Sequence, residues 1–208
     1  MIRVADDGAL RLITLDRPDK ANALTSGMLE ALCEAVEGAA EARALVLTGA
    51  GKVFSAGADL EAARAGLATS PLWERLSGAV AGFEGLSIAA LNGTVAGGAM
   101  GMVLACDLRI APASAKMFYP VMKLGFLPQP SDPARLAALA GPARAKMILM
   151  GGVKVGAEEA MRSGLIDRLA EGDVLAEARA LAADTLAATP EHARAIKALI
   201  PALPGAVR

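Results

Sequence analysis

The hydrophobic pattern in the first half of the chain predicts strands that alternate with helices. Leu10–Leu15 alternates apolar with polar residues and ends in a turn sequence, which predicts a strand. The continuous apolar runs at residues 44–48 and 88–91 are typical of strands that are buried on both faces. Residues 108–111 predict a further strand.

Apolar residues at helical spacing predict a helix over residues 25–38. Thr25 or Ser26 can cap its start, and Gly38 can end it. Residues 98–106 are apolar nearly all round, which predicts a helix buried in the core.

The second half of the chain predicts mostly helices. We expect them over residues 134–139, 143–150, 157–163, 174–186 and 190–200, with an extended segment at 165–167. Pro201 and Pro204 can stop the last helix. Alternating strands and helices followed by a helical tail indicate an α/β core with an α-helical C-terminal part. We expect the core to span residues 1–167 and a short helical C-terminal region to span 168–208.

The composition narrows the classes of function. Of 208 residues, 54% are hydrophobic and 21% are charged, which predicts one folded globular unit. The net charge is −1 and the basic residues are scattered, so we expect no nucleic-acid partner and no membrane-surface binding. There is no run of about 18 apolar residues that would predict a membrane span. The N-terminus lacks the apolar core of a signal peptide, so we expect a cytoplasmic protein.

The cysteine and histidine content argues against a metal centre. Cys33 and Cys106 lie in apolar helical patterns and predict buried free thiols rather than a disulfide. His192 is the only histidine, which leaves few ways to build a metal site or a histidine-based triad. We therefore expect no metal.

Two glycine-rich segments each follow an apolar run and lead into a predicted helix. They are Phe54-Ser55-Ala56-Gly57-Ala58-Asp59-Leu60 and Asn92-Gly93-Thr94-Val95-Ala96-Gly97-Gly98. Such a pair can direct two backbone N–H groups at one point, where they stabilise an oxygen that becomes negative during a reaction. The alternative is that the glycines only allow tight turns and close packing. Because both segments occur with suitable flanks, the sequence favours a site.

These segments resemble the crotonase (enoyl-CoA hydratase/isomerase) superfamily. Further matches lie between about Leu12 and Ile200: Leu15-Asp16-Arg17-Pro18, Asn22-Ala23-Leu24, Val46-Leu47-Thr48-Gly49, Ala105-Cys106-Asp107, Lys123-Leu124-Gly125 with Pro128, and Gly164-Leu165-Ile166-Asp167. The resemblance implies an α/β fold, namely a crotonase-like (ClpP/crotonase) spiral of β-β-α units with an α-helical C-terminal part. It also implies a homotrimer or a dimer of trimers.

The resemblance also implies a ligand and the residues that hold it. The ligand is an acyl-CoA thioester, with coenzyme A as part of the substrate and no separate cofactor. The N–H groups of Ala58 and Gly98 are the implied oxyanion-hole donors. The implied CoA-binding positions are Lys20, Ala21, Ala23, Leu24, Ala56, Gly57, Ala58, Asp59, Leu60, Gly97 and Gly98. Lys20 can pair with a phosphate or remain solvated, and we expect Asp59 and Asp107 to bond backbone groups.

The sequence departs from the family at the two catalytic carboxylates. Hydratases of the family use two glutamates, and the matching positions hold Gly101 and Val121. Neither side chain accepts a proton, and a general acid or base typically contributes about 10²–10⁴-fold. We therefore expect inefficient hydration. A glycine inside a helix costs about 0.5–1 kcal/mol relative to alanine, so we expect Gly101 to make room for a ligand or for a neighbouring side chain.

Four residues are candidates for a substitute acid, base or orienting group: Gln129, Asp132, Tyr119 and Glu61. Each also has a plain structural interpretation. We expect Asp132 to cap a helix whose first position is Pro133, and Tyr119 to lie in a strand as a core residue. Glu61, like Glu74, lies in a segment that often forms a mobile pocket wall in this family, but exposed helical glutamates are common.

Three functions fit these observations. The first is an enzyme that acts on a CoA thioester through the Ala58 and Gly98 donors. The second is a catalytically silent acyl-CoA binder or regulatory homologue. The third, an ordinary hydratase with displaced glutamates, is disfavoured because the flanking motifs fix the alignment. The chain ends at Arg208, soon after the predicted last helix, whereas typical family members continue with a further helix that helps to cover the ligand and to build the trimer. The sequence leaves open whether this chain keeps that lid and that assembly.

Overall fold

The computed structural model describes residues 1–201, which form an α/β structure with two sheets. The larger sheet has the spatial order β1 (Ile2–Asp7), β2 (Leu10–Leu15), β3 (Ala44–Gly49), β5 (Leu86–Ala90), β7 (Leu108–Pro112) and β10 (Arg168–Ala170). Its strands are parallel apart from the β1–β2 hairpin. The smaller sheet contains β4 (Val53–Ser55), β6 (Thr94–Ala96), β8 (Lys116–Phe118) and β9 (Val155–Gly156).

The chain passes repeatedly from the larger sheet to the smaller one and then into a helix. Thus β3, β5 and β7 are followed by β4, β6 and β8, and each pair leads to a helix. The helices are α1 (Ser26–Glu37), α2 (Leu60–Arg64), α3 (Leu72–Gly82), α4 (Ala99–Ala105), α5 (Val121–Leu124), α6 (Asp132–Ala140), α7 (Pro142–Leu149), α8 (Ala157–Arg162), α9 (Val174–Ala187) and α10 (Pro190–Leu199). Two short 3₁₀ turns are η1 (Pro18–Lys20) and η2 (Leu67–Thr69). This succession is the predicted series of β-β-α units.

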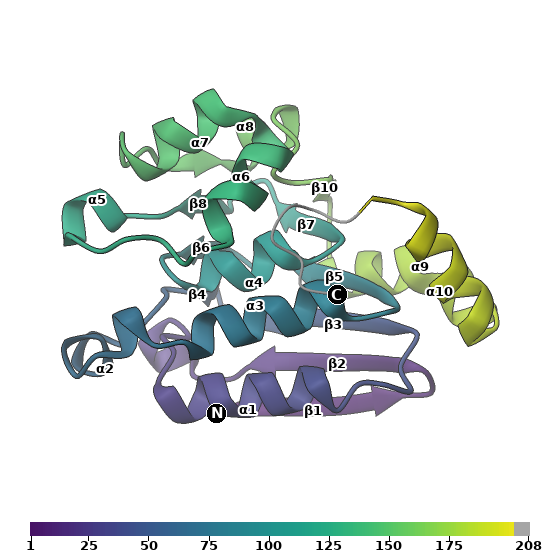
Figure 1. Ribbon diagram of the computed structural model, residues 1–208. Coiled ribbons are helices and arrows are strands. Elements are labelled where there is room, and N and C mark those ends of the chain that lie inside the picture. Colours follow the sequence, from purple (N-terminus) through teal and green to yellow (C-terminus); the bar gives the residue numbers. More distant parts are fainter. Residues whose placement is uncertain (202–208) are drawn as a thin grey trace.

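Helices cover both faces of the larger sheet, which explains the continuous apolar runs. In β3, Leu45 and Leu47 join the core that contains α1 and α3, whereas Ala44 and Val46 pack on the face covered by α9. Figure 1 shows α1 and α3 running along the sheet, with α9 and α10 set apart from them at the C-terminal end. The prediction that this strand is buried on both faces is confirmed.

Several predicted boundaries agree with the structure. The Thr25 side chain caps α1 by accepting from the N–H of Met28, and Gly38 follows its last residue. The helix predicted at residues 98–106 is α4, in which every residue is buried. The extended segment predicted at 165–167 is wrong, because the strand β10 begins only at Arg168. Pro204 lies outside the described residues.

The smaller sheet and α3 were not foreseen from the pattern. The strands β4, β6, β8 and β9 have two or three residues each, which is too short for an alternating signal. They matter because both glycine-rich segments leave from this sheet. Within residues 1–201, no helix combines the length and apolar character needed to cross a bilayer.

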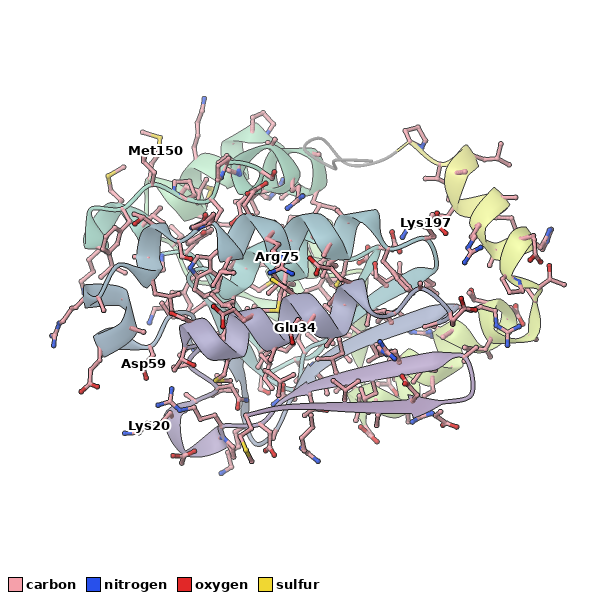
Figure 2. The ribbon with its side chains drawn as sticks, turned by 60° about the horizontal axis from the view of Figure 1, so that its bottom comes forward. Lys20, Glu34, Asp59, Arg75, Met150 and Lys197 are labelled. Atoms are coloured by element: carbon pink, nitrogen blue, oxygen red, sulfur yellow. The ribbon has the colours of Figure 1, made fainter. Side chains whose placement is uncertain are left out.

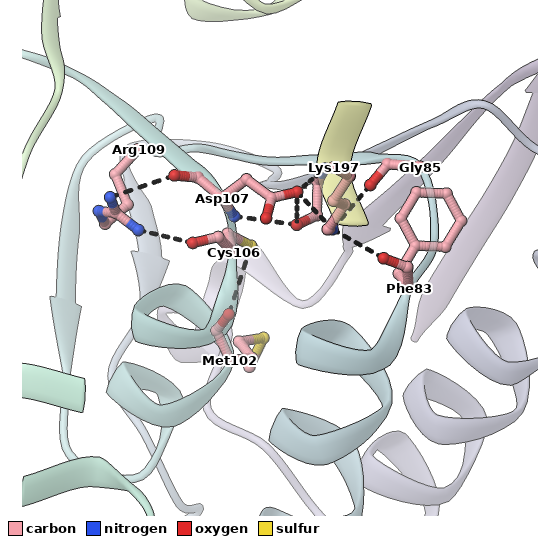
Figure 3. Close-up of polar contacts among 8 residues, drawn as sticks. Phe83, Gly85, Met102, Cys106, Asp107, Arg109 and Lys197 are labelled. Atoms are coloured by element: carbon pink, nitrogen blue, oxygen red, sulfur yellow. Dashed lines mark hydrogen bonds and ion pairs between the residues drawn. The ribbon is translucent and has the colours of Figure 1, made fainter. Parts of the chain in front are cut away.

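Polar contacts fix the last helix to the rest of the chain. The ammonium of Lys197 donates to the carbonyls of Phe83 and Gly85 at 2.7 and 2.8 Å, and to Oδ2 of Asp107 at 2.7 Å (Figure 3). Asp107 also accepts from the N–H of Ser87 at 2.8 Å. As expected, Asp107 therefore has a structural role. The division at residue 167 stays a prediction.

Candidate active site

The first glycine-rich segment presents the N–H of Ala58 away from its neighbouring loop. The N–H of Leu24 donates to the carbonyl of Gly57, and the N–H of Asp59 donates to the carbonyl of Leu24, each at 2.8 Å. Successive residues of an extended chain point their N–H groups to opposite sides. The Ala58 N–H therefore points away from Leu24, and no group in residues 1–201 accepts its hydrogen bond.

The second segment brings Gly98 to the first turn of α4. The N–H of Gly97 donates to the carbonyl of Phe118 at 3.1 Å, and the carbonyls of Gly97 and Gly98 accept from Met100 and Gly101. Gly97 has φ +58° and Gly57 has φ +90°, conformations that favour glycine. No hydrogen-bond acceptor for the Gly98 N–H is found in the described part of the chain.

The two segments touch through their backbones. A Cβ atom at residue 57 would lie 2.8 Å from the carbonyl oxygen of Ala96, 3.3 Å from Cα of Gly97 and 3.4 Å from the nitrogen of Gly98. Only glycine at position 57 allows this approach. The Ala58 and Gly98 nitrogens are therefore brought together, on residues that are each half-exposed. The arrangement can stabilise an oxyanion.

The loop at residues 17–24, called the fixed loop below, lies beside the first glycine-rich segment. Asn22 is fully buried; its side chain accepts from the N–H of Arg17 and donates to the carbonyls of Ala50 and Val53. Ala21 and Asn22 both have positive φ, at 50° and 53°, an uncommon conformation for residues other than glycine. Loops held in such geometry often belong to ligand sites.

Three charged residues, Arg17, Lys20 and Asp59, lie in or beside this loop. The guanidinium of Arg17 donates to the carbonyl of Ala23 at 3.0 Å and to Asp59 Oδ2 at 2.8 Å. This hydrogen bond lowers the pKa of Asp59, which also caps α2 by accepting from backbone N–H groups. As predicted, the Asp59 carboxylate thus accepts hydrogen bonds from backbone N–H groups. Lys20 is exposed at the same end of the molecule (Figure 2), and Leu60 is also exposed.

A buried carboxylate occupies the space in front of Gly101. A Cβ atom at residue 101 would lie 2.9 Å from Asp132 Oδ1 and 3.1 Å from Oδ2. The expectation that Gly101 makes room for a neighbouring side chain is confirmed. The prediction that Asp132 caps α6 is wrong, because Ser131 holds the cap position and Asp132 is the first helical residue. Its side chain turns inward and is 1% exposed.

Asp132 is held by one strong hydrogen bond. The phenol of Tyr119 donates to Oδ2 at 2.9 Å, whereas Oδ1 has no hydrogen-bond partner in residues 1–201. Tyr119 is a core residue, as predicted, although it follows β8 instead of lying in a strand. Burial, followed by the charge of Asp132, raises the pKa of Tyr119, so that the phenol remains a donor.

Two more charged residues face this carboxylate. Burial raises the pKa of Asp132 to about 7; the Tyr119 hydrogen bond and the Arg135 charge oppose the shift, and the Glu74 charge adds to it. Arg135 is fully buried on α6. Glu74, from α3, accepts from the hydroxyl and the N–H of Ser131. The groups that act on Asp132 therefore come from three parts of the chain: the segment after β8, helix α6 and helix α3.

The other candidates are placed differently. The Gln129 amide donates to the carbonyl of Ala68 at 3.3 Å, and its side chain thus bonds η2. Glu61 is exposed on α2. Val121 is buried at the start of α5. Cys33 and Cys106 are buried free thiols, as predicted, and burial raises the pKa of Cys106 to about 12.

Sequence reasoning missed the roles of two supporting residues. Arg135 lies inside the helix predicted over residues 134–139, and Asn22 begins one of the short family matches. Both are fully buried. A lone arginine in an otherwise apolar helix face is the one signal that could have revealed Arg135, because buried charges need partners.

Comparisons with known proteins agree with this architecture. A model of the enoyl-CoA hydratase/isomerase family matches residues 6–202. The chain is 39% identical over 201 residues to the probable enoyl-CoA hydratase EchA14 of Mycobacterium tuberculosis, covering 92% of this chain and 78% of that protein. It is 35% identical over 221 residues to a putative enoyl-CoA hydratase of Thermus thermophilus, covering 99% of this chain and 85% of the other.

Solved structures agree as well. DspI of Pseudomonas aeruginosa has a TM-score of 0.87 at 35% identity, over 95% of this chain and 85% of that one. An enoyl-CoA hydratase/isomerase of Pseudoalteromonas atlantica has a TM-score of 0.87 at 28% identity, over 95% and 81%. The structural likeness extends over both sheets and the C-terminal helices. The chain therefore belongs to the enoyl-CoA hydratase/isomerase (crotonase) family and has its fold.

Proposed function

We propose that this protein binds an acyl-CoA thioester and polarises its carbonyl between the N–H groups of Ala58 and Gly98. The observation that carries the proposal is that these two amides lie on touching backbones and have no acceptor within residues 1–201. Both amides belong to half-exposed residues and have no acceptor within residues 1–201, so they are available to donate to a ligand oxygen. Each donor is expected to contribute about 2.7–4 kcal/mol to stabilising the oxyanion.

The nucleotide is expected to lie along the fixed loop and the first glycine-rich segment. Ala21 and Ala23 are half-exposed there, and exposed Lys20 offers a positive charge to a phosphate. Leu24, expected as a contact, is fully buried and has its N–H and carbonyl bonded to the first segment, so it supports the loop instead. Ala56, Asp59 and Leu60 continue this surface on the other side. No separate cofactor is required. We further propose a cytoplasmic homotrimer or dimer of trimers, which light scattering of the purified protein tests.

The reaction is expected to be something other than efficient hydration. By family resemblance, the two hydratase glutamates correspond to Gly101 and Val121, which carry no proton-transferring group. An acyl transfer or an isomerisation through an enolate needs the same polarised carbonyl. A catalytically silent acyl-CoA binder is the second candidate, and the same two apolar positions are the observation that favours it.

Infrared spectroscopy of a thioester labelled with ¹³C at its carbonyl tests the proposal directly. The carbonyl stretch is expected to move to lower frequency on binding, because two hydrogen bonds withdraw electron density. Ala58→Pro removes one donor and should reverse part of the shift and reduce any turnover about 10²–10³-fold. Ala58→Gly keeps the N–H and is the matched control. An unshifted carbonyl in the wild-type complex would refute the proposal.

A further inference from the structure

The free oxygen of Asp132 is directed at the helix that carries the Gly98 donor. Oδ1 is fully buried, has no hydrogen-bond partner in the described chain, and lies 2.9 Å from the position that a Cβ at residue 101 would take. Bonds from Cα to Cβ in a helix lean toward the N-terminus. The Asp132 carboxylate therefore lies on the side of Gly101 that faces the first turn of α4, about one helical pitch, roughly 5 Å, from Gly98.

The surroundings of this oxygen argue against a purely structural role. A buried carboxylate is costly unless its oxygens are paired, and here one oxygen accepts from Tyr119 while the other has no hydrogen-bond partner among residues 1–201. Asparagine would keep the Tyr119 hydrogen bond without the charge. A carboxylate retained in this form is suited to exchange a proton with a group that enters the site.

We infer that Asp132 is the proton-transfer residue of this site, taking up from α6 the place that a side chain at position 101 of α4 would otherwise fill. The inference rests on the proposed function, since it requires a thioester carbonyl at the Ala58 and Gly98 amides. It assigns to the substrate an acyl group with a hydrogen on the carbon next to the carbonyl.

The step is balanced within the site. The ionised Oδ1 takes a proton from the carbon next to the carbonyl. The electron pair of that C–H bond forms the carbon–carbon double bond of the enolate, and the π electron pair of the carbonyl moves onto its oxygen. The resulting enolate oxygen is held by the two amides. The protonated carboxyl then returns the proton to the same carbon, which gives exchange, or to a carbon two bonds further along an unsaturated acyl chain, which moves the double bond.

Three residues set the position and charge of Asp132. Tyr119, which precedes α5, donates to Oδ2 and favours the ionised form. Arg135 on α6 favours it as well, whereas Glu74 on α3 disfavours it. Tyr119 is therefore a positioning residue. Because Asp132 is 1% exposed, the acyl group must separate neighbouring side chains to reach it.

Deuterium exchange tests the inference. Butyryl-CoA is incubated with the protein in D₂O, and deuterium on the carbon next to the carbonyl is followed by mass spectrometry, while binding is measured in parallel by calorimetry. We expect wild-type exchange and an Asp132→Asn rate at least about 100-fold lower with unchanged butyryl-CoA binding. Asp184→Asn, an exposed change on α9, is the matched control and should exchange at the wild-type rate.

The pH dependence gives a second readout that needs no folded Asp132 variant. Exchange should rise as the pH passes about 7, where Asp132 ionises, and Tyr119→Phe should move this midpoint upward by about one to two pH units. Three outcomes would each overturn the inference and leave thioester binding standing. They are binding without exchange, an exchange rate that does not change between pH 6 and pH 8, and an Asp132→Asn exchange rate within threefold of wild type. Absence of binding would overturn both proposals.

Discussion

Replacing Asp132 by asparagine should stabilise the protein at alkaline pH while it removes proton transfer. The pKa of this carboxyl is raised from 3.8 to about 7, chiefly by burial. Between these values the folded protein binds a proton more tightly than the unfolded chain does. Stability therefore falls as the pH rises through this window, and the full loss is about 4 kcal/mol.

The range that is convenient to measure contains most of this loss. From pH 5 to pH 8 the wild-type free energy of unfolding should fall by about 2–3 kcal/mol through Asp132 alone. Asparagine does not titrate and has nearly the same shape. The variant should therefore match wild type near pH 5 and exceed it by about 2–3 kcal/mol at pH 8.

Urea unfolding followed by circular dichroism at several pH values measures the difference. Comparing the two proteins at each pH cancels the contribution of other titrating groups. If the two stability curves run parallel from pH 5 to pH 8, Asp132 ionises normally and the reasoning from its burial is wrong. A variant that is less stable at every pH would mean that the charge is well compensated by Arg135 and Tyr119.

Three further predictions concern packing around the site and the last helix. Gly101→Glu alone should lower the free energy of unfolding by about 1–3 kcal/mol, because its Cβ meets Asp132. The double variant Gly101→Glu with Asp132→Gly should recover both the stability and the deuterium exchange of the substrate. Equal unfolding midpoints for the single and the double variant would contradict this prediction. Lys197→Met removes hydrogen bonds of 2.7, 2.8 and 2.7 Å and should lower the free energy of unfolding by about 1–3 kcal/mol, with faster amide exchange in α10. Gly57→Ala, at φ +90°, should cost about 1–3 kcal/mol and weaken thioester binding measured by calorimetry; unchanged binding would argue against the donor arrangement.

Much of the fold could be predicted from the sequence because its signals are local. The Thr25 cap, the Gly38 stop and the two-sided burial of β3 each follow from residues within one element. The donor pair could be proposed because glycine at a strand-to-helix turn has a specific conformational meaning. The short strands of the smaller sheet could not be predicted, since two or three residues carry no period.

Only the tertiary structure decided where the Asp132 carboxylate lies. In the sequence it precedes Pro133 at a helix start, and local preference makes it a cap. In the fold, α6 packs against α4, and the missing side chain of Gly101 leaves a space that the carboxylate fills. The two residues are far apart in the chain, and the register between the helices is set by long-range packing. The sequence alone therefore determined the family fold and was enough to propose the amide pair, whereas the location of the buried carboxylate depended on three-dimensional proximity.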